Sequence, residues 1–391
     1  MRDTLIKLTV ILCTLLARPT FAGHQVELHP VYNKADHHTG YAVKVMIGNP
    51  EKEFSVLLDT VTAFLWVVGP DSKHPFCHGK TTYSKVNSST CTTLISSPQT
   101  QLHGCQSVTV CMWNDNISID SLDEERLNFT NSPFGTLLML QWPELEDYQQ
   151  IDGVFGLSAL HINDTVNGVL GFPSPYLKKT DDILQLPTIE TDKIADNPIK
   201  KAIREKQLEP IITIALPSLD SYKTAVLMLG GRDDKLCDLE NEKNEWLVDF
   251  GNRYDFEYLS INMGNAIFLN KFLKTYAYPD TTKPYIGVPD QFMQQIVRNL
   301  NATKNETMKK YMVDCQGSFE PFVMYTPKNI YTLGPEHFII KHNQEDTQCE
   351  LAFRSHGNIF DQTVVLGIPF FHQFCVTLEP RDGRINFAPI I

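Results

Sequence analysis

The chain has 391 residues, of which 42% are hydrophobic and 20% are charged. This composition is typical of a globular protein with a large buried core and excludes a disordered chain. The formal net charge of −12 argues against nucleic acid or an anionic membrane surface as a partner.

The first 22 residues predict a secretory signal peptide. Arg2 and Lys7 lie near the start, residues 8–16 are apolar, and residues 20–22 end in a small residue suited to cleavage. The apolar run is too short to span a bilayer. We therefore expect a protein without a membrane anchor, beginning near Gly23, that is secreted or resides in the endolysosomal lumen.

Most of the remaining chain predicts short strands broken by Gly, Pro, Asn and Asp, so we expect a mainly β fold. The clearest strand candidates are residues 41–48, 54–58, 64–68, 225–229, 364–367 and a terminal pair within 375–387. Helical patterns are sparse. The best helix candidates are residues 197–206 and 289–300, the second with Pro289 near its first turn.

One short pattern occurs twice, about half a chain apart. Asp59 and Asp280 each follow a hydrophobic run and precede a threonine. Asp59 is followed after 97 residues by Gly156, and Asp280 after 87 residues by Gly367. Each of these glycines ends a short apolar run. The repeated order predicts two related halves with a boundary near Leu216.

Several segments resemble the pepsin-like aspartic proteases, in the correct order over nearly the whole mature chain. They are residues 41–50, 59–68 with Trp66, 151–157, 227–231, 277–289, 365–367 and 384–388. The resemblance implies a bilobal, pepsin-like acid protease fold, with two related β-rich lobes around a central cleft. We expect the N-terminal lobe at 23–216 and the C-terminal lobe at 217–391.

The resemblance further implies that Asp59 and Asp280 form a catalytic pair at the floor of the cleft. Carboxylates about 3 Å apart share a proton, so the ionised one can activate a water while the protonated one polarises the scissile carbonyl. Taken alone, each Asp-Thr could be an ordinary turn. The expected ligand is a peptide or an unfolded protein, without a cofactor or metal, and we expect a monomer.

Both loops depart from the family pattern. Val61 and Thr282 stand where the family has glycine, and their β-branched side chains crowd a tight loop. Lys283 stands where the family has a small hydroxyl residue. A lysine beside the pair would keep a carboxylate ionised. The alternative is that Lys283 faces solvent, which is the commoner behaviour of lysine. The supporting loop residues are Thr60, Val61, Thr62, Thr281, Thr282 and Lys283.

The family's flap motif is also missing between Cys105 and Ile151. Trp113 is the one aromatic residue placed to substitute for it, and a packed strand aromatic is the alternative. Two functions remain open from the sequence. One is an aspartic endopeptidase with reduced or lost activity, and the other is a non-catalytic homologue that binds peptide or protein.

Nine cysteines become eight once Cys13 leaves with the signal peptide, which predicts four disulfides in an oxidising compartment. Cys77, Cys91, Cys105 and Cys111 allow three pairings in the first half. In the second half the resemblance implies Cys315 with Cys349, leaving Cys237 with Cys375.

Two further features concern modification and metal binding. Six glycosylation acceptors support secretion: Asn87, Asn116, Asn128, Asn163, Asn301 and Asn305. His37-His38 and Cys77-His78 lack matching ligands at a recognised spacing, so we expect no metal site.

Overall fold

The structure is a computed structural model. It describes residues 23–391 apart from 104–105, 124, 149, 159–196, 249–252, 270–272, 307–309, 344 and 357–361. The expected signal peptide, Cys105 and Asn163 lie outside the described residues, so what was expected of them stays a prediction. We call residues 23–216 the first half and residues 217–391 the second half.

The fold is mainly β, as predicted, and one large sheet connects the two halves. In spatial order its strands are β12 (Lys243–Trp246), β27 (Arg384–Pro389), β26 (Phe374–Glu379), β10 (Ile212–Ala215), β11 (Ala225–Leu229), β1 (His24–Tyr32), β2 (His38–Ile47), β3 (Lys52–Asp59), β9 (Gly153–Gly156), β4 (Leu65–Val68), β8 (Arg126–Gln141), β7 (Gln106–Asp120) and β5 (Thr92–Thr93), with β6 (Gln99–His103) paired to β7. Strand β1 links the halves because it pairs with β11 on one side and β2 on the other.

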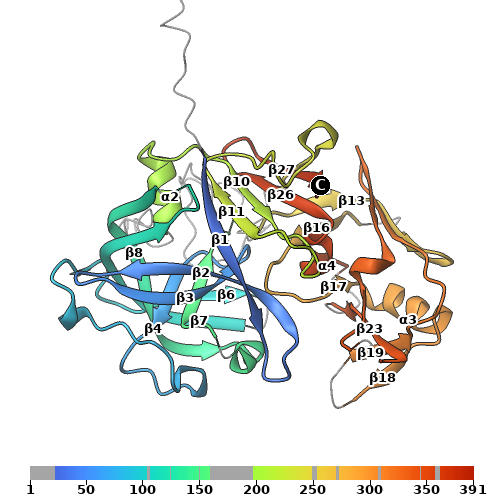
Figure 1. Cartoon of the computed structure of the whole chain (residues 1–391), viewed down its shortest axis with the longest axis horizontal. Helices are drawn as coiled ribbons and strands as arrows, with labels where there is room; N and C mark the ends of the chain where they lie inside the picture. Colours follow the sequence, from blue (N-terminus) through green and yellow to red (C-terminus); the bar gives the residue numbers. More distant parts are fainter. Residues whose placement is uncertain are drawn as a thin grey trace, which may run out of the picture.

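Three smaller sheets belong entirely to the second half. They comprise β13 (Phe256–Tyr258), β16 (Thr275–Pro279), β25 (Val364–Leu366), β17 (Ile286–Val288) and β24 (Phe353–Ser355); β15 (Ala266–Leu269), β14 (Ser260–Met263), β20 (Phe322–Tyr325) and β21 (Ile330–Leu333); and β18 (Thr303–Asn305), β19 (Lys310–Asp314), β23 (Gln348–Leu351) and β22 (Ile339–Ile340). Figure 1 shows the blue and green first half on one side and the orange and red strands of the second half on the other.

Helices are few and short. The α-helices are α2 (Pro198–Arg204), α3 (Asp290–Asn299) and α4 (Ile368–Phe371), and the 3₁₀ turns are η1 (Pro75–Cys77), η2 (Lys85–Asn87), η3 (Pro143–Asp147), η5 (Leu239–Asn241) and η6 (Pro335–His337). The helices predicted at 197–206 and 289–300 are confirmed. Asn197 caps α2 by accepting from the Lys200 N–H, and Pro289 is the N-cap of α3. In the part of the chain that the structure describes, no helix is long and apolar enough to cross a membrane.

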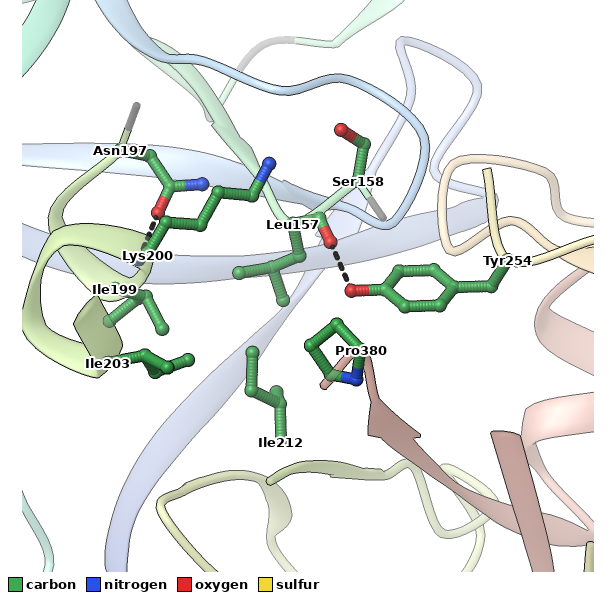
Figure 2. A pocket seen from close by; sticks show the side chains of 9 residues that line it. All are labelled: Leu157, Ser158, Asn197, Ile199, Lys200, Ile203, Ile212, Tyr254 and Pro380. Atoms are coloured by element: carbon green, nitrogen blue, oxygen red, sulfur yellow. Dashed lines mark hydrogen bonds between the residues drawn. The ribbon is translucent and has the colours of Figure 1, made fainter. Parts of the chain in front are cut away.

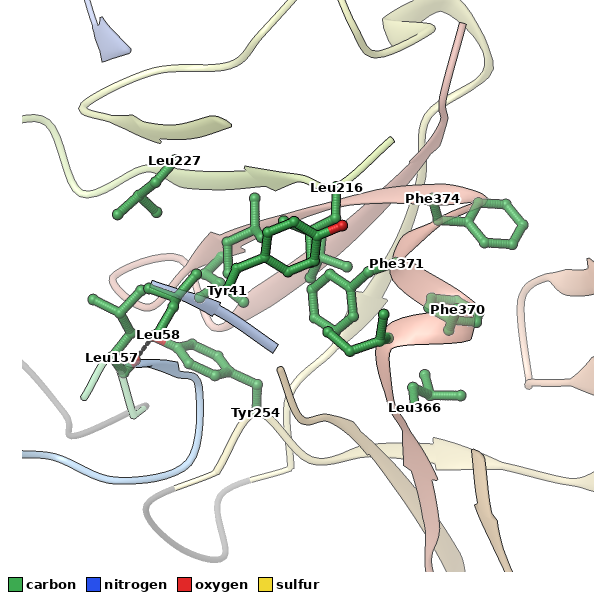
Figure 3. Packing of buried hydrophobic residues seen from close by; sticks show 14 of the residues in the cluster. Tyr41, Leu58, Leu157, Leu216, Leu227, Tyr254, Leu366, Phe370, Phe371 and Phe374 are labelled. Carbon is green, nitrogen blue, oxygen red and sulfur yellow. Dashed lines mark hydrogen bonds between the residues drawn. The ribbon is translucent and has the colours of Figure 1, made fainter. Parts of the chain in front are cut away.

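One hydrophobic cluster runs through both halves. Figure 3 shows Tyr41 of the first half beside the Phe371 ring of the second half, and Leu58 and Phe370 belong to the same cluster. All four side chains are buried. Because burial of each large apolar side chain stabilises the folded state by roughly 1.5–3 kcal/mol, this shared core opposes separation of the halves.

The duplicated pattern in the sequence is a duplicated strand arrangement. Strand β9 runs parallel to β3 and antiparallel to β4, while β25 runs parallel to β16 and antiparallel to β17. Gly156 and Gly367 occupy equivalent positions with no room for a side chain. A Cβ on Gly156 would lie 2.3 Å from the Thr62 carbonyl oxygen, and one on Gly367 would lie 2.0 Å from that of Tyr285. The close approach of each loop to its apolar-Gly strand explains why glycine recurs there.

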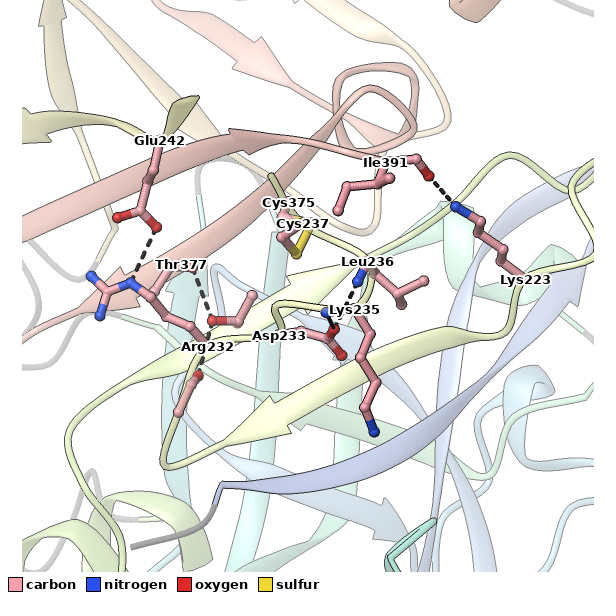
Figure 4. Close-up of a disulfide and its surroundings, with 12 residues drawn as sticks. Lys223, Arg232, Asp233, Lys235, Leu236, Cys237, Glu242, Cys375, Thr377 and Ile391 are labelled. Atoms are coloured by element: carbon pink, nitrogen blue, oxygen red, sulfur yellow. Dashed lines mark hydrogen bonds and ion pairs between the residues drawn. A yellow bond between two sulfur atoms is a disulfide. The ribbon is translucent and has the colours of Figure 1, made fainter. Parts of the chain in front are cut away.

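The two disulfides implied for the second half are present. Cys237 pairs with Cys375, and Cys315 pairs with Cys349, with Cα–Cα distances of 5.9 and 5.0 Å. Figure 4 shows the first bond where the segment after Arg232 meets β26, close to the chain end. It therefore links the C-terminal strands covalently to the early part of the second half.

The expectation of four disulfides is wrong for the cysteines described in the first half. Cys77, Cys91 and Cys111 are all unpaired. Strand β5 pairs Thr92 with Asn114 and Thr93 with Trp113, so this register puts Cys91 about four residues, or about 13 Å, from the position opposite Cys111. A disulfide needs Cα atoms within about 7 Å.

Candidate active site

The two aspartates have equivalent surroundings at the ends of equivalent strands. Asp59 is the last residue of β3, and Asp280 directly follows β16. The Val61 N–H donates to Asp59 Oδ1 at 2.7 Å, and the Thr282 N–H donates to Asp280 Oδ1 at 2.9 Å. Loss of the two glycines has therefore not removed the backbone donors that orient each carboxylate.

Neither replacement needs an unusual backbone conformation. Positive φ angles at described non-glycine residues occur at other positions, so neither Val61 nor Thr282 is strained in that way. The consequences of the two replacements therefore come from their side chains and not from the backbone.

Two threonines bind the loops to each other. Thr60 Oγ1 donates to the Pro279 carbonyl at 2.8 Å, and Thr281 Oγ1 donates to the Leu58 carbonyl at 2.7 Å. The Thr281 N–H also donates to Thr60 Oγ1 at 3.3 Å. All these groups are buried, so the reciprocal bonds fix the position of one aspartate loop relative to the other.

The side chains that replace the glycines pack around the pair. Val61 is in contact with Tyr278 and Val365 of the second half in a small buried cluster. Thr282 Oγ1 donates to Asp280 Oδ1 at 2.6 Å, so this oxygen accepts two bonds from one residue. In both aspartate loops, atoms that a glycine lacks therefore occupy buried space.

Burial dominates the electrostatics of the pair. Asp59 and Asp280 are each 0% exposed, and within the described residues neither Oδ2 atom has a hydrogen-bond partner. Burial, and then the negative charge of Asp280, raise the pKa of Asp59 to about 6, against the opposing effect of the Thr62 hydroxyl and nearby N–H groups. One proton is therefore held at this pair up to mildly acidic pH.

Lys283 lies beside the aspartates and is not turned to solvent. Its side chain is only 6% exposed, and its ammonium lies 6.0 Å from the ring centre of Trp142. Burial disfavours the charged form, yet the negative charge of Asp280 and smaller contributions from Tyr285, Glu144 and Asp59 leave the pKa of Lys283 raised. Lys283 thus places a positive charge next to the pair.

A buried tyrosine completes the surroundings. The Tyr148 hydroxyl is placed to donate to the Thr39 carbonyl at 3.3 Å and to the Thr282 carbonyl at 3.4 Å. It therefore connects the start of β2 with the second aspartate loop. No sequence motif had indicated Tyr148, because its partners lie 109 and 134 residues away.

Trp113 occupies the packed strand position that was the alternative to a flap. It lies within β7 opposite Phe134, its Nε1 donates to Thr136 Oγ1 at 2.9 Å, and the Lys85 ammonium lies 4.5 Å from its ring centre. The hairpin that approaches the first loop is formed instead by β6 and β7. There Gln101 Oε1 accepts from the Ala63 N–H at 3.0 Å.

A small pocket lies near the first loop, since Ser158, which lines it, donates its N–H to the Thr62 carbonyl. Figure 2 shows it between α2 and Tyr254, whose hydroxyl donates to the Leu157 carbonyl at 2.9 Å. Neither Asp59 nor Asp280 lines it. In the described part of the chain no group of His, Cys, Asp and Glu side chains could hold a metal ion.

The glycosylation acceptors can be placed with one exception. Asn87, Asn116, Asn128 and Asn301 are exposed, Asn305 is half-buried, and Asn163 lies outside the described residues. Asn116 lies on β7, the strand that contributes to the hairpin near the first loop.

Two β-rich halves that each bring an Asp-Thr loop to a common buried centre define the class of aspartic-protease folds. The chain matches the family described as eukaryotic aspartyl protease over residues 40–390, and it belongs to this family. Membership of this family implies binding of a peptide substrate.

Three relatives illustrate the similarity. Pregnancy-associated glycoprotein 2 of Bos taurus is 25% identical over 94% of this chain and 86% of its own length. Aspartic protease 6 of Caenorhabditis elegans is 22% identical over 89% of this chain and 81% of its own length. A pregnancy-associated glycoprotein of Equus caballus is 29% identical over 95% of this chain and 86% of its own length.

Proposed function

We propose that this protein is a secreted pepsin-family homologue that binds a peptide or unfolded protein between its halves and hydrolyses it weakly or not at all. The observation that carries this proposal is the complete burial of the Asp59 and Asp280 side chains, each 0% exposed. Hydrolysis requires both carboxylates to contact a water and the scissile carbonyl.

The side chains around the pair supply a physical reason. Val61 and Thr282 add buried atoms where the family has none, and Lys283 adds a buried cation. A displacement of reacting groups by about 1 Å can reduce a rate roughly 100-fold. Crowding at the water site therefore lowers turnover while it leaves the more distant parts of the peptide-binding surface unchanged.

A working aspartic endopeptidase is the second candidate, and two observations favour it. Each aspartate keeps its backbone donor, and Asp59 keeps a proton up to a pKa of about 6. Below that pH the pair would hold one shared proton, which is the state that hydrolysis needs. This candidate requires a movement that exposes the pair.

Secretion and glycosylation are part of the proposal. The predicted signal peptide, the six acceptor sites and the exposure of Asn87, Asn116, Asn128 and Asn301 all support passage through the secretory pathway. The two disulfides are in keeping with an oxidising compartment. Endoglycosidase sensitivity of the protein recovered from culture medium would test this part.

The sharpest test restores the family's loops in one protein. The triple variant Val61→Gly, Thr282→Gly, Lys283→Ser removes the three side chains that crowd the pair. We expect it to hydrolyse a fluorescently labelled unfolded protein below about pH 6, at a rate at least about tenfold above wild type.

The matched control adds Asp280→Asn to the triple variant, which must abolish the gained hydrolysis. Binding of the labelled protein to wild type, followed by fluorescence anisotropy, is expected without cleavage. A triple variant that folds as wild type, by circular dichroism and urea unfolding, yet gains no hydrolysis would reject crowding as the cause of inactivity. Rapid cleavage by wild type would support the second candidate.

A further inference from the structure

Two consecutive histidines of the first half lie against two histidines of the second half. The ring of His37 stacks on that of His342 with centroids 4.1 Å apart, and the ring of His38 stacks on that of His372 at 6.0 Å. His38 begins β2, and His372 directly follows α4. We call these four residues the histidine contact.

The hydrogen bonds around the first pair require His37 to be neutral. Lys310 Nζ lies 3.0 Å from His37 Nδ1 and 2.6 Å from Glu350 Oε2, which also lies 2.8 Å from His342 Nε2. An ammonium group can only donate, so Nδ1 of His37 must present its lone pair. A proton on that nitrogen would remove the hydrogen bond and place two cations side by side.

Other charged groups near this pair do not change that conclusion. Asp36 and Glu350 favour a protonated His37, whereas burial, Lys310 and His342 oppose it, and the opposing effects prevail, so the pKa of His37 is lowered. Arg354 lies 4.0 Å from the second oxygen of Glu350 and adds further positive charge.

The second pair is more deeply buried. Its neighbours are Tyr32 and Tyr41. The Tyr41 hydroxyl lies 3.4 Å from His372 Nε2, and the positive charge of a protonated His337 nearby would lower the pKa of His372. His38 Nε2 has no hydrogen-bond partner among the described residues. Burial lowers the pKa of His38 to about 4, and burial with the charge of His38 lowers that of His372 to about 3.

We propose that the histidine contact is a pH-dependent contact, which holds the two halves together near neutral pH and weakens on acidification. A protonated His37 is repelled by the Lys310 ammonium, and a protonated His38 or His372 would be a charged ring buried away from water. Separation of the rings removes the repulsion and lets water reach the charged rings. The proposal does not depend on whether the aspartates hydrolyse peptides.

The contact is connected to the aspartate loops through one residue. Thr39 follows His38, and its carbonyl is the acceptor for Tyr148, whose hydroxyl also reaches the Thr282 carbonyl. Movement of the start of β2 away from the second half therefore disturbs the Tyr148 contacts beside Asp280. Acidification would in this way increase access to the buried pair.

Hydrogen exchange measured by mass spectrometry tests the proposal on the intact, glycosylated protein. Exchange is compared at about pH 7.5 and about pH 5 after correction for the intrinsic rates, in wild type and in His37→Gln, His38→Gln. For wild type we expect residues 33–42 and 368–373 to lose protection at the lower pH, while the strand pair β26–β27 stays protected.

The slope of this transition identifies the linked groups. Each linked proton changes the ratio of open to closed molecules by at most about tenfold per pH unit, so this ratio for wild type, measured at pH values between about 5 and about 7.5, should change by up to about a hundredfold per pH unit if two histidines take part. The double variant should lose most of this dependence. Its matched control, His78→Gln at an exposed position, should behave as wild type.

Three results would overturn the proposal. They are equal protection of residues 33–42 at both pH values, an unchanged pH transition in the double variant, and simultaneous loss of protection in β26–β27, which would indicate global unfolding. Should the double variant fail to fold, the single variant His37→Gln replaces it. Its amide oxygen can still accept from Lys310, and a pH slope equal to that of wild type would count against the proposal.

Discussion

The backbone N–H of Thr281 donates a hydrogen bond to the side-chain oxygen of Thr60 over 3.3 Å, where the two halves of the chain meet. The Thr60 hydroxyl in turn donates to the Pro279 carbonyl, and that of Thr281 donates to the Leu58 carbonyl. The loops that carry Asp59 and Asp280 are therefore held by reciprocal bonds, although both have lost the following glycine. This arrangement of the two loops therefore does not require glycine beside the aspartates.

Removal of one hydroxyl from this arrangement should destabilise the whole molecule. Thr60→Val keeps the shape of the side chain but leaves the buried Pro279 carbonyl and Thr281 N–H without this partner. We expect a loss of about 1–3 kcal/mol in the free energy of unfolding, measured with urea. Thr93→Val, at an exposed strand position, is the control and should change stability by less than about 0.5 kcal/mol. Equal effects of the two substitutions would contradict a structural role for the Thr60 bonds.

Asp59 should make the protein less stable as the pH rises through the mildly acidic range. Its pKa is about 6 in the folded protein against an ordinary value of 3.8, so the folded state binds more protons between these values. The free energy of unfolding contributed by this group therefore falls as the pH increases from about 4 to about 6, by about 2–3 kcal/mol in total.

The variant Asp59→Asn removes this dependence. Relative to wild type, its stability should be greater at pH 7 than at pH 3, as measured by denaturant unfolding at a series of pH values. Asp234→Asn, at an exposed position, serves as the control and should show no such trend. A constant difference between Asp59→Asn and wild type over the whole pH range would mean that Asp59 has an ordinary pKa.

The unpaired cysteines of the first half give a chemical prediction. Cys77, Cys91 and Cys111 are free, and Cys77 is buried with its thiol placed to donate to Ser72 Oγ at 3.1 Å. Unfolded but unreduced protein should therefore react at these three positions when alkylated, whereas Cys237, Cys315, Cys349 and Cys375 should not. Peptide mapping by mass spectrometry measures both sets. Detection of a disulfide between Cys91 and Cys111 would contradict the β5–β7 register, and a disulfide from either of them to Cys77 would contradict the unpaired state of these cysteines.

Sequence patterns predicted the features whose physical cause is local or repeated. The spacing of Asp59 to Gly156 and of Asp280 to Gly367 is visible because each glycine is required by a close backbone approach. The helix predicted at 197–206 also has local causes, since Asn197 caps α2 and Pro198 lies at its start.

Features that depend on distant partners were not predictable in this way. The cysteine pairing of the first half depends on the register of β5 against β7, which no local motif specifies. The burial of Lys283 depends on aromatic residues more than 100 positions earlier in the chain, such as Trp142. His37 and His38 attracted notice only as metal ligands, because their partners His342 and His372 lie more than 300 residues away.

The most direct test of the central claim is the hydrolysis of an unfolded protein by purified wild type beside Asp280→Asn, over about pH 3 to about pH 7. Asp280→Asn replaces one buried carboxyl group by a neutral amide of similar shape and leaves the rest of the binding surface unchanged. The account predicts that both proteins bind the unfolded protein and that neither cleaves it at an appreciable rate. Cleavage by wild type that disappears in Asp280→Asn would contradict the account, because it would show that Val61, Thr282 and Lys283 still leave a functional aspartate pair.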